Sequence, residues 1–302
     1  MALPKLNVPV YEAVLPSTEK VIKYRPFLVK EEKILLTAME AGEDSAMIPA
    51  VKQIINNCIE GEIDVERLPT FDIEYLFLRL RAKSVGEKAT LGVKPWGCPK
   101  NNGELCENST QVEINLEEVN VIKTKDHSNK VMLDDNIGIK LSYPDMNKLG
   151  NVDKIDSAEA GMKIIKDCIE MIFTEEETHD KGSFNEKELD EFLDSLNTQQ
   201  FTLIRNFFDT MPVLKHTVKY KCETCGEKKG NNCTRIKLFF RIGLSHNSLE
   251  NYYLTSFAMI QHHKWSLTEL EDMMPYERDI YVSLLQIWIK EENERIEKQK
   301  HR

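Results

Sequence analysis

Four cysteines in two widely separated pairs constrain the fold of this chain more than any other feature. Seven residues separate Cys98 from Cys106, and two residues separate Cys222 from Cys225, which a glycine follows. A Cys-x-x-Cys-Gly turn lets two thiolates converge on one cation, at zinc–sulfur distances of about 2.3 Å. Proline, asparagine and glycine residues allow the longer loop of the first pair to turn back as well. The pattern predicts that all four thiolates hold one Zn²⁺ ion.

Two alternatives to this four-thiolate site stay open. Cys222 and Cys225 could form a cytosolic dithiol, although the sequence around them favours strand, turn and strand over the strand-then-helix context of a redox motif. Cys233 or His216 could also replace one of the four ligands. Four protein ligands leave no coordination position for water or substrate, so the predicted zinc site is structural and not catalytic.

The remaining cysteines indicate the compartment in which the chain folds. Cys58 and Cys168 each lie at helical spacing from apolar residues, which predicts that both are small core side chains. Seven cysteines are an odd number, and two on buried helix faces do not fit the disulfide framework of a secreted protein. We therefore expect folding in a reducing cytosol.

Composition and charge narrow the function. The chain has 302 residues, of which 41% are hydrophobic and 30% charged, as in ordinary globular proteins. Its net charge of −10 argues against nonspecific nucleic-acid binding, which depends on Lys and Arg, and favours protein partners. There is no run of about 20 apolar residues and no signal-peptide core at the start. We therefore expect a soluble protein that has no membrane partner and is not exported by a signal peptide.

Residues 1–97 are expected to form a first domain, in which a β-hairpin packs on helices. Two short extended runs flank the turn-forming residues Pro16–Glu19. Helical periodicity follows, and Gly42 ends the first helix. The expected strands are 8–15 and 20–26, and the expected helices are 29–41, 44–60 and 69–84.

Residues 98–233 are expected to form an inserted domain bounded by the two cysteine pairs. Alternating apolar residues predict a small antiparallel meander, and helical periodicity follows. Because 115 residues lie between the pairs, a metal that joins them would clamp the base of the insertion. The expected strands are 111–116, 119–123, 130–133 and 137–141, the expected helices are 158–173, 186–196 and 198–208, and a last hairpin has strands 216–221 and 234–241.

Residues 234–302 are expected to form a C-terminal helical block. Ser266 and Glu269 match a capping box, and Pro275 is expected to restart the helix. From residue 290 the sequence is almost wholly charged, which is typical of a solvated helical tail, with a partner-docking helix as the alternative. The aromatic and methionine side chains of this block are expected in the core, with an interface as the alternative. They are Tyr252, Tyr253, Phe257, Met259, Trp265, Met273, Met274 and Trp288, and an apolar stripe contains Ile280, Tyr281, Leu284, Leu285 and Trp288.

Motifs that carry catalysis are missing from the sequence. It contains no glycine-rich phosphate loop, nucleophile elbow or zinc-protease helix. His262 and His263 are adjacent, so on a helix they point about 100° apart and do not readily share a metal ion. The chain is therefore not expected to be an enzyme or to have a small-molecule substrate. The strand and helix patterns predict an α+β protein. It is expected to be mainly helical, with an N-terminal hairpin, a small antiparallel β insertion and a zinc-ribbon-like four-cysteine clip.

Two segments resemble the baseplate hub proteins of T4-like bacteriophages. The first is Leu-Pro-Ser-Thr-Glu-Lys-Val-Ile-Lys-Tyr-Arg-Pro-Phe-Leu-Val-Lys-Glu-Glu-Lys-Ile-Leu-Leu at residues 15–36, followed by Ala-Met-Glu at 38–40. The second is His-His-Lys-Trp-Ser-Leu-Thr-Glu-Leu-Glu-Asp-Met-Met-Pro-Tyr-Glu-Arg-Asp-Ile-Tyr at residues 262–281. The resemblance implies a non-enzymatic hub component, or an assembly chaperone for the hub, that contacts other tail proteins. It further implies assembly in the host cytoplasm, followed by retention in the virion tail baseplate or release.

Three residues in the first segment are predicted partner contacts. Arg and aromatic side chains are enriched in protein interfaces, which motivates the choice of Arg25, Phe27 and Lys30. Pro26 ends the strand and keeps Arg25 extended. An internal ion pair between Arg25 and a carboxylate such as Glu31 is the competing interpretation.

The cysteine pattern taken alone suggests a different class of protein, a zinc-ribbon module that binds nucleic acid. Basic residues around both pairs make this region locally positive inside an acidic chain. They are Lys94, Lys100, Lys219, Lys221, Lys228, Lys229, Arg235 and Lys237. DNA binding with a steep salt dependence would favour this alternative.

Overall fold

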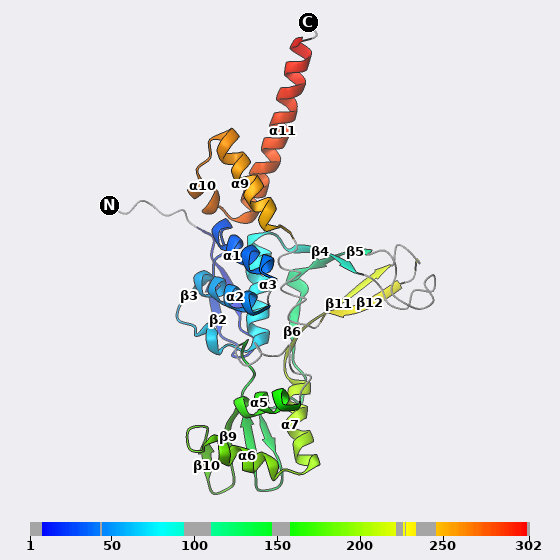
Figure 1. The fold of residues 1–302 in the computed structure, drawn as a ribbon. Coiled ribbons are helices and arrows are strands. Elements are labelled where there is room, and N and C mark those ends of the chain that lie inside the picture. The colour runs from blue at the N-terminus through cyan, green and yellow to red at the C-terminus, as the bar shows by residue number, and fades with distance from the viewer. Residues whose placement is uncertain are drawn as a thin grey trace, which may run out of the picture.

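The structure is a computed structural model with an elongated shape. Figure 1 shows a central helical body, a small α/β unit at one end, a helical block at the other end, and two β-hairpins that extend sideways. Helices make up about half of the described residues and the strands pair antiparallel, so the expected α+β class is confirmed. The structure describes residues 8–42, 44–93, 110–146, 158–221, 226, 228–233 and 246–300.

The N-terminal hairpin is confirmed. Strands β1 (Tyr11–Val14) and β2 (Val21–Tyr24) pair antiparallel, with Tyr11 opposite Tyr24, and β3 (Ile59–Glu60) adds to the free edge of β2. Glu19 takes a left-handed conformation in the turn, at φ 59°. Side chains alternate along β2, so that one face of the hairpin packs on the helices and the other faces solvent.

Three helices build the central core. They are α1 (Val29–Glu40), α2 (Asp44–Cys58) and α3 (Thr70–Ser84), with a short 3₁₀ turn η1 (Val65–Arg67) before α3. Positive φ at Gly42 follows the end of α1, as the sequence predicts. Cys58 is 1% exposed inside this core, which agrees with its predicted role as a small apolar side chain.

The next strands pair differently from the expected meander. Strand β5 (Thr110–Asn115) pairs with β4 (Lys88–Val93), and after the 3₁₀ turn η3 (Leu116–Glu118) strand β6 (Asn120–Ile122) pairs with β11 (Val213–Lys221). The prediction of four locally paired strands is therefore wrong. Buried residues of β5 and β11 join the central core, and this distant packing selects the strand partners.

A second core lies in the small unit. Its sheet has the order β10 (Thr178–Asp180), β9 (Ile169–Phe173), β8 (Gly138–Leu141) and β7 (Lys130–Met132), so β7 and β8 form one predicted hairpin. The helix expected over 158–173 is too long, because α5 (Ala158–Cys168) stops and β9 begins at Ile169, which pairs with Leu141. Two helices, α6 (Glu186–Asp194) and α7 (Thr198–Thr210), complete the unit.

The side-chain packing of this unit draws on residues 131–208, and Cys168 is wholly buried in it. The division of the chain at residues 97/98 and 233/234 stays a prediction. Strand β11 contains the expected strand 216–221, but it pairs with β12 (Lys228–Cys233), with His216 opposite Cys233, and β12 does not coincide with the expected second strand. Residues 234–241, the expected second strand, lie outside the described residues.

Within residues 246–300, the described part of the C-terminal block, the helices are α9 (Leu249–His263), α10 (Leu267–Glu271) and α11 (Pro275–Lys300). The capping box is confirmed, because the Glu269 amide donates to Ser266 Oγ at 3.2 Å and the Ser266 amide donates to Glu269 at 2.8 Å. Pro275 begins α11 as predicted. In the described part of the chain, none of the helices is long and apolar enough to cross a membrane.

Candidate protein-binding site

The three predicted partner contacts lie between β2 and the first turn of α1, and the structure gives each of them an internal contact. Arg25 binds Glu31 through two parallel hydrogen bonds, Nη1 to Oε2 at 2.9 Å and Nη2 to Oε1 at 2.7 Å. It also donates to the carbonyl oxygens of Pro26 and Asn57. The hydrogen bonds to Glu31 raise the pKa of Arg25 against the opposing effect of burial. The internal pair proposed as the competing interpretation is therefore present.

Glu31 also caps the helix that it opens. Its Oε2 accepts the Leu28 amide at 2.8 Å, so one carboxylate satisfies a helix N-terminus and a guanidinium together. Phe27 is fully buried and its amide donates to Ser84 Oγ at 2.8 Å. Lys30 is half exposed and pairs with Asp272 at 2.6 Å. Of the three residues, Lys30 presents the most surface, and the partner-binding role of all three stays a prediction.

A buried charged cluster fastens the C-terminal block to α1. Glu32 is wholly buried and accepts hydrogen bonds from Arg278 Nη1 at 2.6 Å and from Asn247 Nδ2 at 3.1 Å. His246 is a further hydrogen-bond partner of Glu32, with its Nε2 atom 2.8 Å from Glu32 Oε1. Burial alone would raise the pKa of Glu32, but the hydrogen bond with His246 and the charge of Arg278 outweigh it and lower that pKa. Glu32 is therefore an ionised anchor.

Further contacts hold α1 against α10 and the start of α11. The Val29 amide donates to the Met273 carbonyl oxygen at 2.8 Å, and Lys33 pairs with Glu271 at 3.5 Å. Tyr252 on α9 donates its hydroxyl to the same Glu271 at 3.1 Å and packs, 2% exposed, against Val29. The C-terminal helices thus pack on α1 through a defined interface, which has an ionic centre and apolar surroundings.

The aromatic side chains of this block are only partly in the core, contrary to expectation. Tyr252, Ser256 and Met259 share the inner face of α9 and are buried. Tyr253 and Phe257 lie on the outer face and are 53% and 64% exposed. The expectation failed because residues one or five positions apart in a helix fall on different sides of it.

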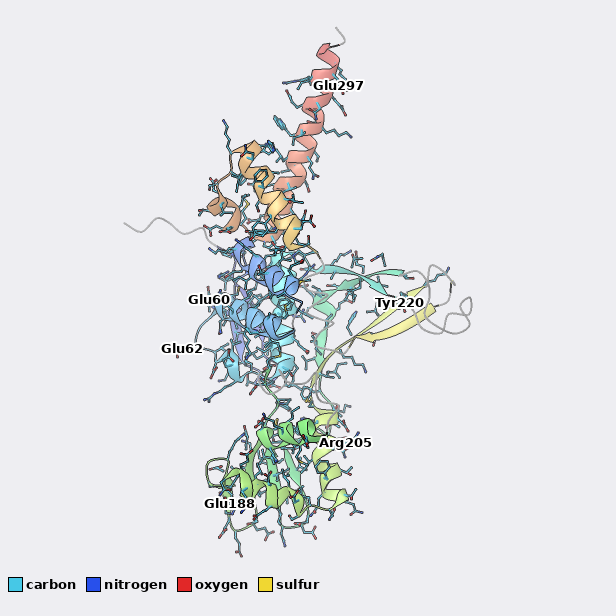
Figure 2. The ribbon with its side chains drawn as sticks, in the orientation of Figure 1. Glu60, Glu62, Glu188, Arg205, Tyr220 and Glu297 are labelled. Atoms are coloured by element: carbon cyan, nitrogen blue, oxygen red, sulfur yellow. The ribbon has the colours of Figure 1, made fainter. Side chains whose placement is uncertain are left out.

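Helix α11 carries a second exposed apolar face. Figure 2 shows it projecting away from the body, with Glu297 near its far end. Trp265 packs edge-on against Tyr281 at a centroid distance of 5.3 Å, which joins the end of α9 to this face. The exposed apolar residues of α11 are Ile280, Tyr281, Leu284, Ile287, Trp288 and Ile296. Exposed apolar faces of this size are typical of interaction sites.

The predicted metal ligands Cys98, Cys106, Cys222 and Cys225 lie outside the described residues. The strands that precede and follow each pair form two antiparallel hairpins, with Val93 opposite Thr110 and Lys221 opposite Lys228. Strands β5 and β11, one from each hairpin, contact each other. Among the described residues, no group of three or more His, Cys, Asp and Glu side chains could hold a metal ion.

Titratable groups with strongly perturbed pKa values lie on α3. Burial raises the pKa of Glu74 to about 8, and burial raises that of Asp72 to about 6 against hydrogen bonds from Ser17. His262 and His263 lie at the end of α9, with their ring centroids 6.4 Å apart. None of these groups lines the 400 Å³ surface hollow between the first hairpin and β6.

The sequence interpretation missed the cluster around Glu32. Val29, Glu32 and Leu36 are three and four residues apart, so they lie on one face of α1. On that face, Val29 and Leu36 pack against Tyr252. That spacing could have shown that Glu32 is buried and needs a cation. The cation is Arg278, which lies 246 residues further along the chain, so no local sequence pattern identifies it.

Together, the helical block held against α1 and its exposed apolar faces have the features of a protein interaction surface. A model of the family described as T4 bacteriophage base plate protein matches residues 8–241, well over half of the chain. The chain belongs to this family. The match includes the resembling segment at 15–36 and ends before the one at 262–281. No curated protein and no solved structure matches the chain.

Proposed function

We propose that this protein is a structural component or assembly chaperone of the baseplate hub in the contractile tail of a T4-like bacteriophage. The observation that carries the proposal is the base plate family match over residues 8–241. The hub assignment rests in addition on the resemblance of residues 15–36 to hub proteins. The protein acts in the host cytoplasm during assembly, through contacts with other tail proteins and without catalysis.

Features of the surface support an interaction role. The net charge of −10 disfavours nonspecific nucleic-acid binding, while exposed aromatic side chains such as Phe257 and Trp288 are the residue types enriched in protein interfaces. The Glu32–Arg278 pair holds the helices that bear them against α1. Partner subunits would therefore meet a preorganised surface, which lowers the entropic cost of binding.

Phage production tests the proposed function directly. A nonsense codon in the gene for this protein, in a host that cannot suppress it, is expected to leave infected cells with few or no complete baseplates. Electron microscopy of the lysate measures this, and expression of the wild-type protein from a plasmid should restore intact tails. Normal numbers of contractile tails without the protein would contradict the proposal.

A structural Zn²⁺ ion held by Cys98, Cys106, Cys222 and Cys225 is the second part of the proposal. The hairpins next to these cysteine pairs have contacting strands, β5 and β11, which supports a joint site. Such an ion would clamp the base of the proposed inserted domain 98–233, between domains 1–97 and 234–302. Metal analysis should find one zinc per chain. A metal-free, fully folded sample with four freely reactive thiols would refute the site.

The predicted contacts Arg25, Phe27 and Lys30 need a test that separates binding from folding. Arg25→Ala removes the paired guanidinium, and Arg67→Ala is a matched control because the Arg67 side chain is 87% exposed and pairs with nearby Asp64. A partner role predicts fewer assembled hubs with Arg25→Ala than its loss of fold stability explains. Normal hub yield together with reduced stability would leave Arg25 a purely internal role.

One observation favours a nucleic-acid-binding module as a second candidate. On the hairpin β11–β12, Lys221 lies directly opposite Lys228 and Lys229 opposite Tyr220. Like charges directly opposite each other, as Lys221 and Lys228 are, destabilise a sheet, and the phosphates of a bound nucleic acid would offset the two charges. A steep fall of DNA affinity with rising salt concentration would support this candidate. Absence of DNA binding at 50 mM salt would exclude it.

A further inference from the structure

The sequence of α11 between residues 280 and 289 is that of a buried helix. Eight of these ten residues are apolar, and only Ser283 and Gln286 are polar. A helix that is apolar on all sides is normally enclosed by protein or lipid. Yet Ile280, Leu284 and Trp288 are 53%, 56% and 56% exposed.

The exposed apolar residues form one face on each of two helices. On α11 they lie at positions i, i+1, i+4, i+7 and i+8, which fall within about 120° of the helix circumference. On α9 the same spacing recurs at i, i+1, i+4 and i+7. The members are Tyr253, Leu254, Phe257 and Ile260 on α9, and Ile280, Tyr281, Leu284, Ile287 and Trp288 on α11. We call them the α9 face and the α11 face.

Lipid does not fit as the cover. Ten helical residues extend about 15 Å, whereas the hydrocarbon core of a bilayer is about 30 Å thick. The helix continues into a charged segment from Lys290, which includes Glu291, Glu292 and Glu294. A protein surface with its own apolar face is the better match.

We propose that a second copy of this chain covers the α11 face, by a twofold crossing of two α11 helices at Leu284, with the α9 faces at the sides. The face runs from Ile280 to Trp288 and is centred on Leu284. A twofold axis there places apolar residues of one copy on apolar residues of the other, as an isologous interface requires.

The exposed area is sufficient for such a dimer. At roughly 180 Å² for a large apolar side chain, the exposed fractions of its five residues give the α11 face about 500 Å². Two copies would bury about 1,000 Å² through α11 alone and nearly 1,800 Å² with the α9 faces, within the usual range of specific interfaces. The α11 face alone lies within the range of about 300–600 Å² found for the largest apolar patch on an ordinary monomer, and the two faces taken together exceed it.

The charges beside the face are compatible with self-association. Beyond Trp288, acidic and basic residues are intermixed, and Arg295 already pairs with Glu292 at 2.7 Å on the same helix. This mixture gives the projecting end of α11 little net charge that would repel a second copy. A crossing of the helices also lets these ends diverge into solvent.

The proposal is independent of the hub function. Residues 246–300, which carry both faces, lie beyond the family match at 8–241. A dimer could exist whether or not the protein belongs to the hub, and a hub protein could be monomeric.

Sedimentation velocity of the full chain between 1 and 100 μM tests the dimer. Wild-type protein should be a dimer at the upper end of this range. Leu284→Asp should weaken the dimer at least about 100-fold, since it places two charges at the axis. Gln286→Asp is the matched control, because it adds the same charge to an exposed position about 200° away and should leave the dimer intact.

Several outcomes would overturn the proposal. They are a monomer at 100 μM, a Leu284→Asp variant that dimerises as wild type does, or a dimer that dissociates in 1 M NaCl, which would mean an ionic contact. Circular dichroism should show that Leu284→Asp keeps its helical content, because the Leu284 side chain is more than half exposed. If that variant unfolds, Ile287→Asp gives the same test.

Discussion

Replacement of Arg278 by methionine is expected to loosen the whole C-terminal helical block. The Arg278 and Glu32 side chains are 5% and 0% exposed, and their shortest hydrogen bond is 2.6 Å. Removal of one partner of a buried pair leaves an uncompensated charge and costs about 3–5 kcal/mol. His246 and Asn247 still contact Glu32, so we expect the lower end of that range, about 3 kcal/mol.

Hydrogen exchange measures this loss at the level of single helices. A loss of about 3 kcal/mol raises the open population of the block roughly 100-fold, so amides of α9 and the first turns of α11 should exchange faster by that factor. Amides of α6, in the separate core of residues 131–208, should not change. Arg295→Met is the control, because Arg295 is 68% exposed and its pair with Glu292 is worth at most about 1 kcal/mol.

A double variant separates the charge from the packing. Glu32→Leu together with Arg278→Met removes both charges and should recover part of the stability, since apolar pairs often replace buried ion pairs at little cost, while His246 and Asn247 lose their shared acceptor. The reasoning is refuted if Arg278→Met exchanges within threefold of wild type, or if the double variant is as labile as the single one.

Two further substitutions test the interior. Glu74→Gln should match wild type at pH 5 and be more stable by about 2 kcal/mol or more at pH 8. Burial raises the pKa of Glu74 in the folded protein to about 8, so the wild-type protein loses stability as the pH rises from about 4.5 to 8. A difference in the urea midpoint that is the same at both pH values would contradict this. Gly138→Ala should destabilise the small unit by about 1–3 kcal/mol, because its methyl group would overlap the Phe173 ring and approach Met132 Sδ to 2.8 Å. Hydrogen exchange of the amides in β7 to β9 measures this loss, with Gly182→Ala as the control because the space around Gly182 is open. Equal protection of these amides in the two variants would contradict the prediction.

Local features of the fold were predictable from the sequence. The hairpin β1–β2 follows from two extended runs around Pro16, and α1 to α3 follow from periodicity that ends at Gly42 and near Ser84. The capping box at Ser266 also needed no distant information. Each of these signals acts within a few residues, where propensity and hydrogen bonding are local.

Features that depend on distant packing were not predictable. Alternation identified β5 and β6 as strands, but their partners β4 and β11 are chosen by burial in the central core. Ile169–Phe173 continues the apolar pattern of α5, yet a free edge on β8 turns it into a strand. Periodicity alone does not distinguish a helix from a strand in a short apolar run.

The candidate site shows the same limit. An apolar stripe on α11 was visible in the sequence, but a stripe that packs in the core and one that awaits a partner have the same spacing. Only the exposure of Leu284 and Phe257 in the folded chain separates the two cases. The contact between Glu32 and Arg278 likewise depends on the tertiary structure.

Quantitative mass spectrometry of purified tails and of baseplate assembly intermediates tests the proposed function most directly. The account predicts the protein in hub-containing intermediates, at a fixed ratio to other hub subunits. Its presence in mature tails as well would identify a component, and its loss on maturation would identify an assembly chaperone. Absence from both tails and intermediates, in infected cells that contain the protein, would contradict a role in the baseplate.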